Sequence, residues 1–189
     1  MKNLRIPLAL MVLLLIVAAC GSNKAVKNSI DNRPSFVKKP PMDTPEYLFE
    51  TGTGSSVRME VAEEKAMMDA SAKLARKLEQ RVDAMQKSFI EEITSGNAEN
   101  SNYVESFSSV KKIITSATLK GLAKVESEMK PDEQSGGYRA YALVRYPVGE
   151  AAVLLQNALS RDQELYVKFK ESKAFRELEE ELKNYKKDN

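Results

Sequence analysis

The sequence predicts an α+β fold in which one long helix packs on a small antiparallel sheet, with a C-terminal helical extension. Three observations carry this prediction. Residues 57–94 contain neither proline nor glycine, and their apolar side chains repeat at a helical period. The stretch "YRAYALVRYP", residues 138–147, alternates in the way typical of a strand. The charged residues 162–187 keep apolar positions three and four apart, which indicates another helix.

The chain begins with a pattern typical of a secretory signal peptide. The basic residues Lys2 and Arg5 precede residues 6–19, a run in which no side chain is polar or charged. This run is shorter than the roughly 20 apolar residues that a bilayer span needs. We therefore expect residues 1–19 to be a cleaved signal peptide. An uncleaved anchor helix is the alternative interpretation.

The segment Val17-Ala18-Ala19-Cys20 resembles the lipobox of bacterial lipoproteins, and Cys20 is the only cysteine in the chain. The resemblance implies that the Cys20 sulfur takes a diacylglycerol and that the new amine is then acylated, with palmitate-like chains. Three acyl chains would hold the protein at a membrane almost irreversibly. Gly21 and Ser22 follow, where lipoproteins retained in the inner membrane usually carry aspartate. The resemblance therefore implies localisation to the outer membrane.

The amino-acid composition argues against several classes of function. Removing residues 1–19 takes away two of the 29 basic residues and none of the 27 acidic ones, so the mature chain has no net formal charge. A neutral chain argues against a nucleic-acid partner. The chain has no histidine, which excludes Ser-His triads and histidine metal ligands. We expect no enzymatic activity, no cofactor, no metal ion and no small-molecule substrate; a hydrolase acting through carboxylates alone is the least favoured reading.

The first part of the mature chain is predicted to be a tether. Residues 20–45 comprise the lipidated cysteine and a polar segment with four prolines. As a flexible coil, residues 22–45 would reach roughly 25–30 Å. We expect the α+β domain to occupy residues 46–158. It opens with a short strand or extended lead-in at 47–50.

The long helix is predicted to follow a glycine turn. Gly52 and Gly54 form the turn, and Ser55 or Ser56 caps the helix. A second, smaller alanine stripe lies on the other side of the first turns of this helix and suits close packing. The stripe comprises Ala62, Ala66 and Ala70, and the main face comprises Val57, Val61, Met68, Ala72, Ala75, Leu78, Val82, Phe89 and Ile93.

The rest of the domain is predicted to close with a hairpin. Residues 95–102 are a loop, and the next stretch is either a short helix or a strand. Residues 118–129 favour a strand whose Ala123, Val125, Ser127 and Met129 share one face, and 131–137 form a turn. The strand at 138–146 then pairs with it in antiparallel fashion.

The C-terminal part is predicted to be helical. A short apolar helix at 149–159 precedes a charged helix within 159–189. That helix carries Phe175, Leu178, Leu182 and Tyr185, and we expect it to pack on its own domain or to fray into solvent.

Two motifs suggest chemistry but are better explained by structure. Gly52-Thr53-Gly54 before a helix lacks both the third glycine of a dinucleotide fingerprint and the Lys-Ser/Thr pair of a P-loop. The pairs Glu63-Glu64 and Glu91-Glu92 could supply carboxylates, but adjacent helical residues point in different directions. We interpret both pairs as solvated surface.

Together these features resemble the Lpp-twenty family of bacterial lipoproteins, whose domain is similar to those of the flagellar proteins FlgP and FlgT. The resemblance rests on the lipobox, Pro45-Glu46-Tyr47, the Gly-x-Gly, the alanine-rich helix and "YRAYALVRYP", and it covers residues 45–150. The family usually has tryptophan where this chain has Tyr47. The resemblance implies a non-catalytic envelope protein, some of whose relatives form rings or disks at the flagellar basal body.

The leading functional hypothesis is an outer-membrane lipoprotein with a structural or interaction role in the cell envelope. It would contact the membrane through the lipid on Cys20 and would form a homo-oligomer or bind another envelope protein. The strand at 138–146, or its neighbour, would leave an edge open for pairing. The alternative is a periplasmic binding module that regulates an envelope enzyme such as a cell-wall synthase.

Overall fold

The computed structural model describes residues 32–93, 101–117, 119–133 and 135–188. The chain divides into two units, residues 1–34 and residues 35–189, and the fold below is that of the second unit. Its strands and helices are, in order, α3 (Ser35–Lys38), β1 (Tyr47–Ser56), α4 (Met59–Ile93), α5 (Ser101–Ser116), β2 (Ala123–Asp132), β3 (Gly137–Pro147), α6 (Val148–Leu159), α7 (Gln163–Phe169) and α8 (Lys173–Asp188).

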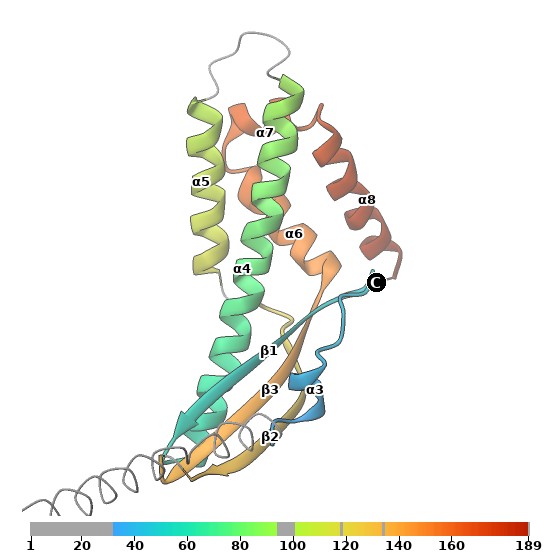
Figure 1. Ribbon diagram of the computed structural model, residues 1–189. Helices are drawn as coiled ribbons and strands as arrows, with labels where there is room; N and C mark the ends of the chain where they lie inside the picture. The colour runs from blue at the N-terminus through green and yellow to red at the C-terminus, as the bar shows by residue number, and fades with distance from the viewer. Residues whose placement is uncertain (1–31, 94–100, 118, 134, 189) are drawn as a thin grey trace, which may run out of the picture. The chain divides into compact units, whose positions relative to one another are not determined.

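The predicted α+β fold is confirmed. A three-stranded antiparallel sheet has the order β1-β3-β2, and the N-terminal half of α4 packs along one face of it (Figure 1). The C-terminal half of α4 continues past the sheet and packs with α5 and α8, and α6 packs against both of these helices. The predicted hairpin is present as β2 and β3. No helix among the described residues is long and apolar enough to cross a bilayer.

Helix α4 has the predicted extent, and Leu78, Val82 and Phe89 of its predicted core face are buried. The N-terminal half of the helix, however, is buried through a different face. The helical pattern predicts Met68 and Val57 on the core face, yet they are 64% and 74% exposed. The alanine stripe is the face that contacts the sheet. Side chains four positions apart form a row that turns slowly around the helix, so this row faces the sheet first and the helices later. Its buried members are Ala62, Ala66, Ala70, Leu74, Leu78 and Val82.

The predicted turn at Gly52 and Gly54 is wrong, because both glycines lie inside β1. They pair with Ala142 and Ala140 of β3, and this row of small residues faces the alanine stripe of α4. A Cβ atom on Gly52 would lie 2.0 Å from the carbonyl oxygen of Ala66. The glycines are therefore needed because strand and helix touch through their backbones.

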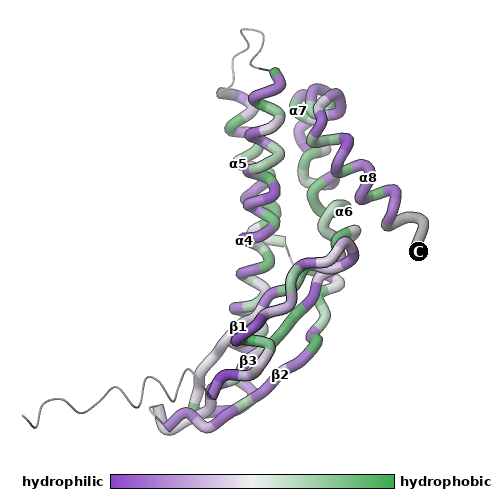
Figure 2. The backbone as a smooth tube through the Cα atoms, turned by 45° about the vertical axis from the view of Figure 1, so that its right-hand side comes forward, coloured by the Kyte–Doolittle hydropathy of each residue, from purple (hydrophilic) through white to green (hydrophobic). Residues whose placement is uncertain are grey.

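Strand β3 has the predicted alternation, whereas β2 keeps it only beyond a bulge. Ala123 pairs with Arg145 but Ser127 pairs with Ala142, so these two side chains lie on opposite faces of the sheet. Ala140, Ala142 and Val144 pack toward α4, and Tyr141 faces the other side. In β2 the register shifts between Lys124 and Glu126, which forms a bulge at Val125. The bulge also takes Val125 out of the predicted alternation and leaves it 48% exposed. Apart from that position β2 is largely hydrophilic (Figure 2).

The helical half has its own aromatic core. The ambiguous stretch after residue 102 is helix α5, which places Phe107 against Phe89 of α4 and Phe169 of α7, with ring centroids 5.9 Å apart in both pairs. The expected single C-terminal helix is two helices, α7 and α8. Its interpretation as a helix packed on its own domain is confirmed, since Leu178 and Leu182 are buried in this core.

The ordered domain begins earlier than the sequence predicts. Phe36 of α3 is buried against Tyr141 and Leu143, on the face of the sheet opposite α4. Asp43 accepts a hydrogen bond from the Phe49 N–H at 2.9 Å. The proline-rich composition of residues 34–45 favours a tether throughout, but burial of Phe36 and the hydrogen bond to Asp43 dock part of this segment on the sheet.

Asp162 begins α7 and supports a prediction about acid stability. Its carboxylate accepts the Leu165 N–H at 3.0 Å and the Ser106 hydroxyl, and the Ser106 and Leu165 hydrogen bonds hold the Asp162 pKa below its ordinary value. We expect Asp162→Ala to lower the free energy of unfolding by about 1–2 kcal/mol at pH 7.

A lowered pKa in the folded state also predicts how this loss depends on pH. The stabilisation is fully present above the unfolded pKa of about 3.9 and disappears as the pH falls through the lower folded value. Urea unfolding at pH 7 and near pH 2 should therefore show a gap between wild type and Asp162→Ala that closes in acid. A gap that stays constant would contradict this role for the carboxylate.

Candidate functional site

The site predicted from sequence, the lipidation of Cys20, lies outside the described residues. The signal peptide and the lipobox lie there as well. Lipid attachment at Cys20 therefore stays a prediction.

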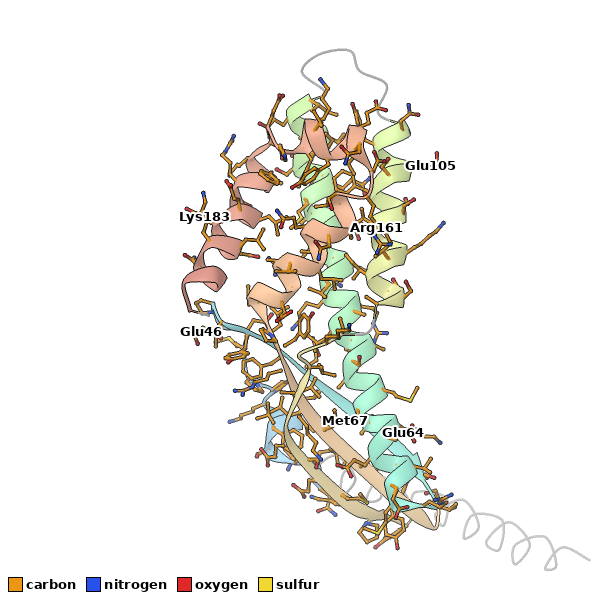
Figure 3. All side chains as sticks on the ribbon, turned by 180° about the vertical axis from the view of Figure 1, so that it is seen from behind. Glu46, Glu64, Met67, Glu105, Arg161 and Lys183 are labelled. Carbon is orange, nitrogen blue, oxygen red and sulfur yellow. The ribbon has the colours of Figure 1, made fainter. Side chains whose placement is uncertain are left out.

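The glutamate pairs do not converge on a common point. Glu63 accepts hydrogen bonds from Lys124 at 2.7 Å and from Ser127 at 3.2 Å, and the Lys124 contact lowers the pKa of the Glu63 carboxyl. Its neighbour Glu64 is exposed on the outer side of α4 (Figure 3). Glu63 thus ties β2 to α4. Among the described residues, no cluster of acidic, histidine or cysteine side chains could hold a metal ion.

The second glutamate pair, Glu91-Glu92, lies at the C-terminal end of α4, and its two carboxylates also point to different places. Glu92 accepts the Lys173 N–H at 2.9 Å and so supports the start of α8. A carboxylate oxygen of Glu91 lies 4.0 Å from the Lys87 ammonium nitrogen, on the exposed side of the same helix. Glu91 and Glu92 therefore have unrelated surroundings, as expected for adjacent helical residues.

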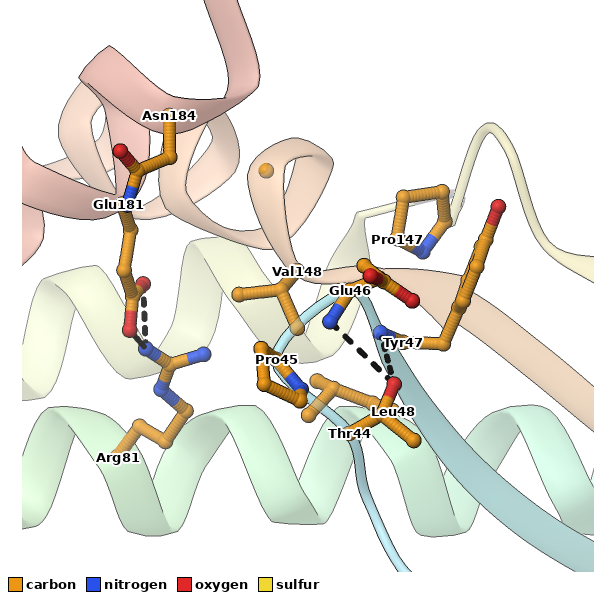
Figure 4. A pocket seen from close by; sticks show the side chains of 11 residues that line it. Thr44, Pro45, Glu46, Tyr47, Leu48, Arg81, Pro147, Val148, Glu181 and Asn184 are labelled. Atoms are coloured by element: carbon orange, nitrogen blue, oxygen red, sulfur yellow. Dashed lines mark hydrogen bonds and ion pairs between the residues drawn. The ribbon is translucent and has the colours of Figure 1, made fainter. Parts of the chain in front are cut away.

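A cleft of about 570 Å³ lies where the sheet meets the helices (Figure 4). An ion pair crosses one wall, with Arg81 Nη2 at 2.5 and 2.6 Å from the two carboxylate oxygens of Glu181. The Val148 N–H donates to the Glu46 carbonyl at 2.9 Å and closes the opposite wall. The full lining is Thr44, Pro45, Glu46, Tyr47, Leu48, Arg81, Pro147, Val148, Gly149, Glu181 and Asn184.

The chemistry of this cleft suits binding of a peptide-like or amphipathic group. Pro45, Leu48 and Pro147 offer apolar surface beside the paired charges of Arg81 and Glu181. Sequence reasoning missed the cleft because Arg81 and Glu181 are 100 positions apart. A smaller cavity of about 330 Å³ lies at the other end of the helices.

The two edges of the sheet differ in how far side chains of α4 cover them. Strand β3 is central, so the edges belong to its neighbours β1 and β2. The edge of β1 is covered by side chains that lie one helical turn apart on α4. Lys65, Lys73 and Lys77 donate to the carbonyl oxygens of Ser55, Thr51 and Phe49 at 3.2, 2.8 and 2.8 Å, and Asp69 accepts the Thr53 N–H at 2.9 Å.

This arrangement satisfies the outward backbone groups that an edge strand leaves exposed. Burial alone would raise the pKa of Asp69, but its hydrogen bonds from Lys73 and the Thr53 N–H outweigh that and hold the pKa below its ordinary value. Burial would lower the pKa of Lys77, but its contacts with Glu50 and Asp43 raise the pKa above the ordinary value. Both side chains therefore stay ionised while they cover β1.

Lys77 allows a test of how much this cover contributes. We expect Lys77→Met to lower the free energy of unfolding by about 1–3 kcal/mol, because it removes charge-assisted bonds to the Phe49 carbonyl, Asp43 and Glu50 while keeping an apolar stem. Chemical denaturation measures the change. Lys87→Met, on an exposed part of the same helix, is the matched control and should change stability by less than about 0.5 kcal/mol. Equal effects for the two variants would contradict the proposed cover.

Comparison with known proteins does not place this chain in a family. No protein-family model matches the sequence, and no curated protein matches it at a significant level. The resemblance to the Lpp-twenty lipoproteins therefore stays a prediction that rests on the motifs given above.

Proposed function

We propose that this chain is an outer-membrane-anchored lipoprotein with a structural or interaction role in the cell envelope, and that it self-associates. The observation that carries the proposal is the N-terminal pattern. Lys2 and Arg5, the apolar residues 6–19 and the lone cysteine in Val17-Ala18-Ala19-Cys20 are the features that a lipoprotein signal requires.

Two features of the folded domain support an interaction role. Large apolar side chains are exposed at Met59 and Met68 of α4 and at Val57 just before it, and contact with a partner would remove them from water. One edge of the sheet, that of β1, is closed by charged side chains, while β2 forms the other edge. A domain with one protected edge is suited to pairing through the other.

A second candidate is the binding module that regulates an envelope enzyme, and the cleft favours it. The cleft combines apolar walls with the Arg81–Glu181 ion pair, which suits a segment of another protein. In that case the surface around Arg81, rather than a sheet edge, would be the point of contact.

Crosslinking of the full chain in intact membranes separates the two candidates. Amine-reactive crosslinking followed by mass spectrometry should yield peptides joined to peptides of the same chain at positions too far apart for one copy. Products that contain only an envelope enzyme, with no self-crosslink at any concentration, would contradict self-association and support the binding module.

A further inference from the structure

The open edge of the sheet carries a charge pattern that is complementary to itself. Along β2, Glu126, Glu128 and Lys130 pair with Leu143, Tyr141 and Arg139 of β3, so their side chains share the face of the sheet opposite α4. Among the described residues, no side-chain hydrogen bond reaches the backbone of residues 124–129 in β2. This contrasts with β1, whose edge is covered by α4.

We propose that β2 pairs with β2 of a second copy of this chain, antiparallel, about a twofold axis at Glu128. The two three-stranded sheets would then form one continuous six-stranded sheet. The inference rests on the self-association proposed above and names its surface. An isologous contact of this kind is the commonest way in which identical chains associate.

Charge selects this register over its neighbours. With the axis at Glu128, Glu126 of each copy lies opposite Lys130 of the other, and opposite charges across strands stabilise a sheet. An axis at Ser127 would instead place Glu126 opposite Glu128. An axis at Met129 would place Glu128 opposite Lys130 twice, but it would also place Glu126 opposite Asp132 twice. Neither alternative therefore has more opposite-charge than like-charge contacts, whereas the axis at Glu128 gives two opposite-charge contacts and one like-charge contact.

The ends of the paired segment also agree with this register. Pro131 has no N–H to donate, and it would lie opposite Val125, where the bulge already interrupts the regular ladder. The paired segment is thus residues 126–130. This register also places Glu128 opposite Glu128 of the second copy, and the two carboxylates repel each other. The Lys130 ammonium of the same strand offsets this repulsion, because its nitrogen lies 2.9 Å from a Glu128 carboxylate oxygen.

Disulfide crosslinking of the full chain in membranes tests the pairing. Glu128→Cys places two thiols opposite each other at the axis, and mild oxidation should give a covalent dimer on a non-reducing gel. The matched control is Glu177→Cys, whose side chain is 67% exposed on α8 and should give no dimer. A dimer in the control but not at position 128 would overturn the proposed surface.

Charge reversal in the Glu128→Cys background tests the register. Glu126→Lys alone or Lys130→Glu alone creates two like-charge pairs in each dimer, so each should reduce dimer affinity about tenfold. The two reversals together restore opposite charges and should restore crosslinking. Thermal melting checks that each variant is folded. Failure of the double variant to recover would overturn the register.

Amine-reactive crosslinking of the wild-type chain distinguishes failure of this inference from failure of the proposed function. Oligomers without a crosslink at position 128 would overturn pairing through β2 and leave self-association in place. A chain that is monomeric by both methods would overturn both. The alternating charges and Pro131 would then serve to protect the edge from other strands.

Discussion

Replacing Gly52 with alanine is expected to destabilise the fold more than any other single methyl addition in the sheet. The new Cβ would lie 2.0 Å from the Ala66 carbonyl oxygen and 2.5 Å from the Ala70 nitrogen. Both are backbone atoms of α4, so no side chain can rotate away. The strand and the helix would have to separate, which breaks the contact between β1 and the alanine stripe.

The magnitude follows from the cost of overpacking. Inserting a methyl group into a close-packed site typically costs about 1–3 kcal/mol, and more where only backbone can move. We expect at least about 3 kcal/mol for Gly52→Ala, a large share of the roughly 5–15 kcal/mol that holds a domain together. For a chain of this size the melting temperature should fall by about 8 °C or more.

Thr53→Ala is the control for Gly52→Ala. Thr53 occupies the next position of β1, and its side chain is exposed on the other face. The control should change the free energy of unfolding by less than about 1 kcal/mol. If both variants melt within a few degrees of wild type, strand and helix are not in backbone contact at Gly52.

Replacing Cys20 with serine is expected to abolish lipid anchoring and leave the folded domain intact. A serine hydroxyl does not substitute for the thiolate that takes the diacylglycerol, so transfer and the following cleavage should stop. The second unit of the chain begins at Ser35, beyond the lipobox. Its melting temperature should therefore be unchanged.

The serine variant alone has an ambiguous location, because its uncleaved residues 6–19 could still hold it at the inner membrane. A chain that lacks residues 1–20 and is exported by an ordinary signal peptide removes this ambiguity. It should fractionate with the soluble periplasm at an unchanged melting temperature. Fractionation with the outer membrane as tightly as wild type would show that attachment is through protein contacts.

Elements with a strong local pattern could be predicted from the sequence. The long helix met its prediction because residues 57–94 contain no breaker, and β3 did because its alternation is unbroken. The predicted turn at Gly52 and Gly54 was wrong because glycine favours a turn locally. Here glycine is needed for another reason: the backbone of α4 lies too close to leave room for a side chain. The prediction of the core face in the N-terminal half of α4 was wrong because alanine gives a weaker hydrophobic signal than valine or methionine.

Features that depend on distant parts of the chain could not be predicted. The cover of β1 uses Lys65, Asp69, Lys73 and Lys77, and their spacing of four shows a shared helix face but not the strand beside it. The cleft depends on Arg81 meeting Glu181 across the fold. Phe36 joins the sheet from within a proline-rich segment, where composition favours a tether.

The most direct test of the central claim is the mass of the mature N-terminus. The protein should be purified from outer membranes in detergent, digested, and its N-terminal peptide measured by mass spectrometry. Lipid anchoring predicts a peptide that begins at Cys20 and carries a diacylglyceryl group on sulfur and an acyl group on the amine. A peptide that begins at Met1, or one with an unmodified Cys20, would contradict the lipoprotein assignment.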